Sequence, residues 1–570
     1  MHRKLLNESR FSQVRSTVNQ DRSKFDLSHG HHATMNAGLL YPHFIREVLP
    51  GDTFEFNASF VNRMSTPIAP IMDTAFLDQW YFYVPQRLVW EHTKQFYGEN
   101  DTSAWTSDVE YFIPQFCPSF YGNNSVGGFK PDTVGDHFGI PTSIELSPGV
   151  VTNPDLKVNA LPFRAYRLIW NEWFRDQNTQ DPLLVNMGDT EIDKTLNDLL
   201  PVNKRKDYFT TCLPEPQKGP DVLLPLGGYA PVITRNEVYS ATAPGLYLSN
   251  LDGDMPDAIL RVSSGHGDPE SFVYADQYYQ NADGTSNQVG EITPETSGIV
   301  APINLWANLS DSTSATINQL RQAFAIQSLF EVDARGGSRY REFIRAHFGV
   351  NVPDLTVQVP EFLGGSSDPI VVNQVVQTSA TDASSPQGNV AAFSKTVGQH
   401  RASFVKSFSE PGYVIGVCAI RTLQSYQDGL DRMWSRRSRL DFYHPVLAHI
   451  GETPVYNKEI YAADVNARDE VFGYQEAWAE YRFAHSYVSG AFRSNYPSGS
   501  LDFWTFTNDF ESLPILSDGF IRETDDNVAR TLATTDMEGA PQFIVDWWFD
   551  LGAYRVMPMF GTPAVLGGRQ

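Results

Sequence analysis

The residues best suited to chemistry in this sequence are arginines interleaved with aromatic side chains, in the segment LDRMWSRRSRLDFYHP. Guanidinium groups bind phosphates and aromatic rings stack on unpaired bases, so this mixture is typical of contacts to single-stranded nucleic acid. The alternative is that the same arginines bridge subunits or cap loops, which suits an acidic protein. The residues that carry the nucleic-acid prediction are Arg432, Trp434, Arg436, Arg437 and Arg439.

A second basic stretch lies at the N-terminus. We predict a basic arm over residues 1–48, with nucleic-acid contacts from Arg3, Lys4, Arg10 and Arg15. An ordinary disordered tail is the alternative. The formal net charge of −24 argues against a chain whose main surface wraps nucleic acid, because phosphates would repel it. Any such contact is therefore local.

The search for catalytic and metal-binding motifs yields little. The sequence has no HExxH, no GxSxG, no dinucleotide fingerprint and no redox cysteine pair. Its three cysteines are far apart and fit neither a disulfide framework nor zinc spacing, which favours a reducing compartment. Two clusters invite a metal assignment, but the first needs a fourth ligand and the second reads as a solvated loop: His29, His31 and His32, and Asp252, Asp254 and Asp257. We predict no enzyme activity, no metal and no cofactor.

No run of 18 apolar residues occurs, and the N-terminus lacks an apolar core of the kind found in secretion signals. We therefore expect a soluble protein made in a cytoplasm, with no membrane contact.

The residues that must position these groups form a β-rich body. Phe54, Phe56 and Phe60 alternate with polar residues, which predicts a strand that turns these rings toward a core. Residues 76–84 are almost entirely apolar and should form a strand that is buried on both faces or forms an interface. Residues 541–561 should form a closing strand, and the turn at Glu410 to Gly412 suits a hairpin.

Helical spacing appears in three places. Residues 161–183 predict an amphipathic helix whose aromatic side chains pack against the β-body or a neighbouring subunit: Tyr166, Trp170, Trp173 and Phe174. A second helix should run from about residue 317 until Gly336 and Gly337 break it, and a third from residue 339 to 348, with Gly349 as its cap.

Residues 234–302 are acidic and rich in turn-forming residues, with ten Asp or Glu against Arg235 and Arg261. We expect a polar surface insertion here. The aromatic residues available in it for self-contact are Phe272, Tyr274, Tyr278 and Tyr279.

Two segments, LPFRAYRLIWNEWFRDQN and DYFTTCLPEPQKGP, resemble parts of the major capsid protein of gokushoviruses, single-stranded-DNA phages of the microvirus family. Similar likeness is found in LPGDTF, MSTPIAPIMD and GLDRMWSRRSRLDFYHPV, so the resemblance covers nearly the whole chain.

The resemblance implies a mainly β fold, an eight-stranded viral jelly roll over residues 49–570, with long loop insertions that contain several helices. It also implies a T=1 shell of sixty copies around a circular single-stranded DNA genome, assembled in a bacterial cytoplasm. The 234–302 insertion would then be the threefold protrusion, used in host-cell attachment. The implied partners are further copies of the chain, single-stranded DNA, a small basic DNA-packaging protein and a host surface receptor.

One alternative of another class stays open. An aromatic-rich β-sandwich can also be a carbohydrate-binding protein or a glycoside hydrolase, which needs two carboxylates at a defined separation. The missing secretion signal weighs against it.

Overall fold

The computed structural model describes residues 22–99, 110–118, 127–147, 150–152, 156–220, 222, 317–376, 390–533 and 541–560, together with seven short strands between residues 232 and 307. The chain divides into two compact units. The first comprises residues 1–218 and 331–570, and the second residues 219–330. Each unit is described by itself below.

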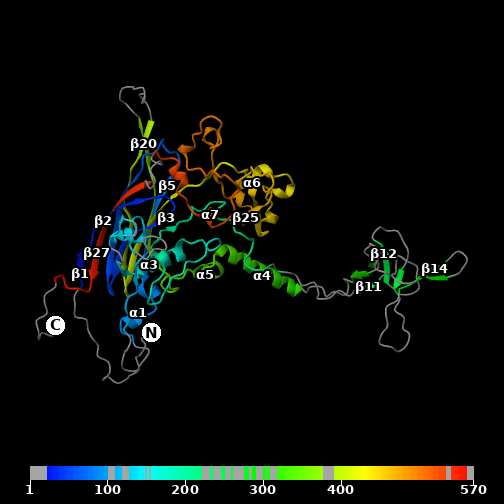
Figure 1. Ribbon diagram of the computed structural model, residues 1–570, viewed down its shortest axis with the longest axis horizontal. Helices are drawn as coiled ribbons and strands as arrows, with labels where there is room; N and C mark the ends of the chain where they lie inside the picture. The colour runs from blue at the N-terminus through cyan, green and yellow to red at the C-terminus, as the bar shows by residue number, and fades with distance from the viewer. Residues whose placement is uncertain are drawn as a thin grey trace, which may run out of the picture. The chain divides into compact units, whose positions relative to one another are not determined.

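Two five-stranded sheets form the body of the first unit (Figure 1). One sheet has the order β1 (Ser23–Asp26), β27 (Phe543–Arg555), β4 (Thr53–Met64) and β21 (Thr396–Ser407), with β2 (His29–Met35) also paired to β27. The other has the order β10 (Leu200–Pro201), β3 (Leu39–Val48), β22 (Gly412–Thr422), β5 (Ala75–Pro85) and β18 (Glu361–Pro369). All of these pairings are antiparallel.

The two sheets pack face to face around aromatic side chains. Phe54, Phe56 and Phe60 of β4 are between 0% and 2% exposed, so the predicted core face of this strand is confirmed. The Phe56 ring lies 4.7 Å from that of Tyr81 in the opposite sheet, measured between ring centroids. Because the two rings come from different sheets, this contact helps to close the sandwich, and ring pairs of this kind add to the gain from burial.

Strand β27 behaves as the predicted closing strand. Trp547 and Phe549 face the core, and Trp547 is aligned with Phe60 of β4 on one side and His31 of β2 on the other. Strand β5 is buried along most of its length, as expected. Its outer face is covered by α3 (Leu161–Ile169) and the π-helical turn η2 (Trp170–Phe174), which form a second core with β5 and β22.

Two expectations about strands are wrong. Residues 23–48, expected in the N-terminal arm, form β1, β2 and β3 in the described structure. Polar and basic residues on the exposed face of β1 and β2 gave this part of the chain the composition of a tail. The turn at Glu410 to Gly412 is not a hairpin, because β21 pairs with β4 whereas β22 pairs with β3 and β5. The turn therefore carries the chain from one sheet to the other.

The helix expected over residues 161–183 ends at Phe174, since Arg175 has extended backbone angles. The other two helices are confirmed. Helix α4 (Ile317–Gly336) is followed by Gly337 at φ 90°, and α5 (Tyr340–Phe348) ends at Gly349 at φ 67°, both in the left-handed region where glycine avoids a steric penalty.

Short elements complete the first unit. Before β18 these are η1 (Gln86–Leu88), α1 (Thr93–Phe96), β6 (Gln115–Phe116), α2 (Val134–His137), β7 (Glu145–Ser147), β8 (Val150–Val151), β9 (Val158–Asn159) and η3 (Lys194–Asn197). After β18 come β19 (Val372–Val376), β20 (Val390–Ser394), β23 (Ser425–Tyr426), η4 (Arg432–Ser435), η5 (Arg439–Asp441), η6 (Pro445–Leu447), β24 (Glu452–Tyr456), α6 (Asn457–Ile460), β25 (Val471–Glu476), η7 (Ala479–Tyr481), β26 (Ser486–Tyr487), η8 (Gly490–Phe492), η9 (Asp502–Trp504), α7 (Asp518–Ile521) and α8 (Asp526–Ala529).

The second unit contains a small antiparallel sheet that the polar composition of residues 234–302 did not predict. Its order is β15 (Ser286–Val289), β14 (Ala275–Gln280), β13 (Ala258–Leu260), β12 (Leu246–Asn250) and β16 (Val300–Pro302). A separate pair is formed by β11 (Val232–Thr234) and β17 (Leu305–Ala307). No helix among the described residues is long and apolar enough to cross a membrane.

Candidate nucleic-acid interface

The structure divides the predicted arginine cluster into two parts. Arg432 pairs with Glu459 at 3.7 Å and Glu480 at 3.8 Å, and its Nη1 donates to the Pro454 carbonyl at 2.9 Å. Arg436 also pairs with Glu480, and its guanidinium lies 4.4 Å from the centroid of the Tyr481 ring. These two arginines are largely buried and neutralised within the chain, which favours a structural role for them.

Arg437, Arg439 and Trp434 lie on the surface beside them. Trp434 is 70% exposed, and the neighbouring rings of Phe442 and Tyr443 are also exposed. This outer half of the cluster keeps the combination of exposed positive charge and aromatic surface that suits unpaired bases. Its contact with nucleic acid stays a prediction.

The other predicted sites fall mainly outside the described residues. Arg3, Lys4, Arg10 and Arg15 lie there, as do Phe272, Tyr274 and the aspartates at 252, 254 and 257. Tyr278 and Tyr279 belong to β14, of which only the strand is described.

The predicted aromatic stripe packs within its own subunit. Tyr166 and Trp170 are buried against the sheet, where the Tyr166 hydroxyl donates to the Leu40 carbonyl at 2.6 Å and the Trp170 indole donates to the Pro201 carbonyl at 2.7 Å. Trp173 and Phe174 are only partly buried and line a pocket. Neither Tyr166 nor Trp170 therefore presents a surface to a second copy.

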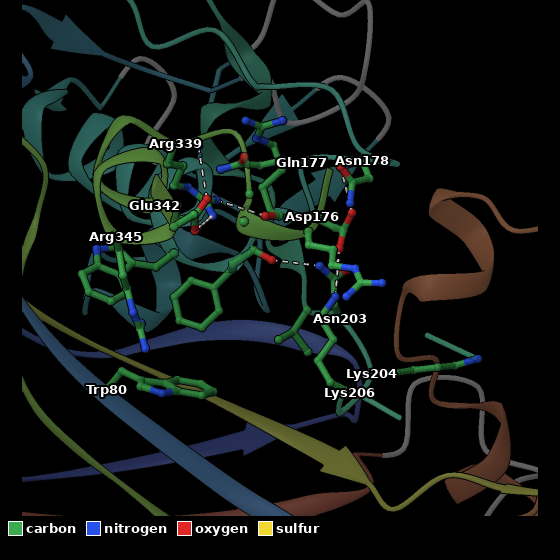
Figure 2. A pocket seen from close by; sticks show the side chains of 18 of the residues that line it. Trp80, Asp176, Gln177, Asn178, Asn203, Lys204, Lys206, Arg339, Glu342 and Arg345 are labelled. Carbon is green, nitrogen blue, oxygen red and sulfur yellow. Dashed lines mark hydrogen bonds and ion pairs between the residues drawn. The ribbon is translucent and has the colours of Figure 1, made fainter. Parts of the chain in front are cut away.

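This pocket has a volume of about 740 Å³ and lies wholly in the first unit (Figure 2). Of its twenty lining residues, two are Asp or Glu and seven are Lys or Arg: Arg175, Lys204, Lys206, Arg335, Arg339, Arg345 and Arg421. Sequence analysis missed it, because the lining residues come from β5, η2 and the loop after it, the segment after β10, the α4–α5 corner and β22. No short motif marks such a site.

Four of the seven cations have carboxylate partners. Lys206 pairs with Asp176 at 2.9 Å, Arg339 with Glu342 at 3.2 Å and Arg421 with Asp78 at 2.6 Å, while Arg335 pairs with Glu452. Arg175, Lys204 and Arg345 have no ion-pair partner among the described residues. Burial lowers the pKa of Lys204. The nearby charges of Glu523 and Asp207 raise this pKa but do not outweigh burial. The pocket therefore has an excess of positive charge.

The histidines and thiols are part of the packing. Burial lowers the pKa of His31 and of His43, and raises the pKa of the Cys212 and Cys418 thiols, which keeps these groups neutral at pH 7. In the part of the chain that the structure describes, no group of three His, Cys, Asp or Glu side chains could hold a metal ion.

Large apolar side chains remain exposed in the loops between β22 and β27. They include Trp434, Leu440, Val446, Phe483 and Tyr487, of which Val446 is 94% exposed. Exposed apolar groups in such number are typical of surfaces that meet other protein chains. A β-sandwich whose long loops expose this much apolar surface is typical of a structural subunit that associates with further chains.

Comparison with known proteins agrees with that class. Residues 12–565 match the family model described as capsid protein (F protein) of phages. The chain is 40% identical to capsid protein VP1 of Bdellovibrio phage phiMH2K, and 37% identical to capsid protein VP1 of Chlamydia phage 1, with 98% of each chain covered in both comparisons. It is also 37% identical to capsid protein VP1 of Spiroplasma virus 4, with 95% of each chain covered.

The chain belongs to this phage capsid protein family. It is a structural capsid protein of the microvirus type and a component of the virion, and the resemblance to gokushovirus capsid proteins is confirmed. Membership of a capsid family implies self-assembly into a shell.

Proposed function

We propose that the sandwich is an eight-stranded jelly roll whose sixty copies form a T=1 shell around circular single-stranded DNA. One observation carries the fold: eight strands pair first with last, second with seventh and so on inward, as β2–β27, β3–β22, β4–β21 and β5–β18. A long antiparallel hairpin rolled over itself produces this order, with two Greek keys in facing sheets.

Assembly would bury the apolar loop side chains described above. A standard protein interface buries about 1,600 Å² in total, and apolar burial contributes roughly 25 cal/mol per Å² before the costs of association. Each interface then contributes only a modest free energy of association, and the closed symmetric shell adds many such interfaces together. Such weak contacts let misplaced subunits dissociate during assembly in the bacterial cytoplasm.

DNA contacts would be local, because the chain is acidic overall. We assign them to the N-terminal residues Arg3, Lys4, Arg10 and Arg15 and to the exposed Trp434, Arg437 and Arg439. A small, separate basic packaging protein would neutralise most of the genome's phosphates, since a chain of net charge −24 cannot.

The insertion at residues 234–302 is assigned to the threefold protrusion and to attachment to a host surface receptor. Its strands belong to a compact unit distinct from the sandwich, which supports a role outside the shell wall. No enzymatic role is assigned. In the basic pocket, the carboxylates of Asp176 and Glu342 form ion pairs with Lys206 and Arg339. A glycoside hydrolase needs two carboxylates that act on the substrate, so this pair gives that alternative no support.

Electron cryomicroscopy of the protein purified from a bacterial cytoplasm tests this function. The expected particle has icosahedral symmetry and a protein mass of about 3.8 MDa, sixty times the subunit mass of 63.9 kDa. The reconstructed wall should show the β2–β27 and β3–β22 pairings in opposite sheets. Particles with another copy number would overturn the T=1 assignment, and a monomer that cleaves glycans would overturn the shell itself.

A further inference from the structure

We propose that the basic pocket is a nucleotide-binding site for single-stranded DNA, with the phosphate held near Arg175 and Arg345 and a base stacked on the indole of Trp80. The inference deepens the proposed function, because it rests on single-stranded DNA as a partner of this chain. It assigns a binding site apart from the exposed arginines at 437 and 439.

The first argument is charge. The pocket wall carries seven cations and two carboxylates on a chain whose net charge is −24, so this concave region reverses the sign of the molecule. Arg175 and Arg345 form no ion pair within the described ranges, whereas the Lys204 ammonium lies over the Phe520 ring with the charges of Glu523 and Asp207 nearby. A concave site lined by one sign of charge concentrates ions of the opposite sign, which makes an anion the expected occupant.

The second argument is hydrogen bonding. Arg175 Nε and Gln177 Nε2 are buried beside the pocket, and neither has an acceptor in the part of the chain that is described. Leaving a buried donor without an acceptor costs free energy, so a ligand that supplies acceptors is favoured. A phosphate diester offers several acceptor oxygens and no donor, and guanidinium groups bind it well.

The third argument is the aromatic wall, which favours a nucleotide over an acidic peptide as the ligand. Trp80 and Trp173 both line the pocket, and the Phe174 ring stands nearly perpendicular to Trp80 with 4.9 Å between ring centroids. The Arg341 guanidinium lies over the Trp173 ring at 3.9 Å, whereas that of Arg421 is 5.3 Å from the Trp80 centroid, so Trp80 is the indole assigned to the base. In Figure 2, Arg345 lies on the same side of the pocket as Trp80, whereas the Lys204 side chain points away from the pocket. A carboxylate gains little from an indole, whereas every base can stack on one.

The site is also built in advance. Gly337 at φ 90° turns the chain sharply between α4 and α5, and this turn places Arg335 and Arg339 on one wall. Arg339 Nη2 then donates to the carbonyls of Asn171 at 2.8 Å and Arg175 at 3.1 Å, which ties that wall to η2. A wall fixed before binding loses little conformational freedom when a ligand enters.

Fluorescence anisotropy with a short labelled oligothymidylate and purified, unassembled protein tests the proposal. Arg345→Glu changes an exposed cation in the pocket, and the matched control Arg63→Glu makes the same charge change on the exposed face of β4 in the other sheet. We expect Arg345→Glu to weaken binding about tenfold more than the control does. For Arg345→Glu, the slope of log affinity against log salt concentration should be smaller in magnitude by about 0.7, the value for one lost phosphate contact on a single strand.

Trp80→Leu separates base stacking from charge. It should weaken oligothymidylate binding roughly 5- to 150-fold, as expected for one lost base–aromatic stack, and should leave competition by inorganic phosphate unchanged. Thymidine monophosphate should compete better than inorganic phosphate. Ultraviolet cross-linking of a bromouracil oligonucleotide should label a peptide that contains Trp80 or Trp173, a readout that loss of stability would not produce.

Three results would overturn the proposal: equal binding by Arg345→Glu and Arg63→Glu, cross-links confined to other segments, or competition by polyglutamate as strong as by the oligonucleotide with no effect of Trp80→Leu. The last result would identify a site for an acidic protein segment. Shell formation is scored separately by electron microscopy. If shells form without pocket binding, the pocket proposal fails alone, and if no shells form, the proposed function fails whatever the pocket binds.

Discussion

Arg436 and Glu480 form an ion pair of 3.1 Å in which the two side chains are only 10% and 11% exposed. The pair joins the segment between η4 and η5 to η7, and the Tyr481 ring shields the guanidinium on one face. Removing one partner of such a pair leaves the other charge buried without full compensation, and a guanidinium enclosed in this way is poorly placed to bind a ligand.

Arg436→Ala should therefore destabilise the subunit. It leaves Glu480 with Arg432 at 3.8 Å as its remaining partner, and we expect the free energy of unfolding to fall by about 1–3 kcal/mol. Arg439→Ala, on the exposed half of the cluster, should change it by less than about 0.5 kcal/mol and should instead lower the DNA content of particles. Urea unfolding and the ratio of absorbance at 260 and 280 nm measure the two effects. Equal destabilisation by both variants would contradict the division of the cluster.

The sequence places these arginines in one cluster but does not show which of them are buried in ion pairs and which are exposed. Their difference arises from Glu459 and Glu480, which lie more than twenty residues further along the chain and reach only Arg432 and Arg436. The basic pocket was missed for the same reason, since its cations come from separate segments that only the tertiary fold brings together. Long-range pairing decides such sites, and a single sequence does not contain it.

Elements with strong local signals were predictable. The two-residue alternation of β4 identified the face that carries Phe56, and Gly337 and Gly349 ended α4 and α5 at positions where only a left-handed residue fits well. The helix that begins at Leu161 was predicted too long, because its apolar pattern already stops at Phe174, residues 175–181 are all polar, and the backbone turns extended at Arg175. The sheet in residues 246–302 was missed because its strands are only three to six residues long and lie in a stretch rich in turn-forming residues.

Tyr166→Phe should weaken the attachment of α3 to the second sheet. The hydroxyl donates to the Leu40 carbonyl at 2.6 Å and accepts from the Leu200 amide at 3.0 Å, and burial raises its pKa, so it stays protonated. Removing it leaves a buried carbonyl and a buried amide each without this partner, which should cost about 1–3 kcal/mol of unfolding free energy. Tyr487→Phe, at an exposed position, is the control and should be neutral within about 0.5 kcal/mol. Thermal melts that coincide for both variants would refute the role assigned to this hydroxyl.

Glu523 should make stability depend on pH. Burial raises its pKa to about 7 from an ordinary value of 4.5, although a hydrogen bond from Thr422 and the charge of Lys204 lower it. Between these pH values the folded chain holds a proton that the unfolded chain has released, so the contribution is complete below pH 4.5, falls as pH rises and is lost above pH 7. It amounts to about 3 kcal/mol, from 1.36 kcal/mol per unit of pKa.

Glu523→Gln removes this titrating group and should flatten the dependence. We expect the unfolding free energy of the wild type minus that of the variant to fall steadily between pH 5 and pH 7, and to stay level from pH 7 to pH 8. Urea titrations of unassembled subunits at these pH values measure the difference, in which other titrating groups cancel. A difference that stays constant, or that rises with pH, would show that the carboxyl is ionised in the folded subunit.

Removing residues 239–298 should leave the sandwich intact. The deletion lies inside the second compact unit, and every strand of the two sheets of the sandwich lies outside it. Replacing the segment by a short Gly-Ser linker shortens one loop, and loop closure depends only weakly on length, by about 0.6 kcal/mol for each doubling. We expect a thermal midpoint within about 3 °C of the wild type, particles that lack protrusions in electron micrographs, and loss of attachment to host cells. Aggregated or unfolded subunits, in a preparation where the full-length chain is folded, would mean that the segment belongs to the core of the subunit.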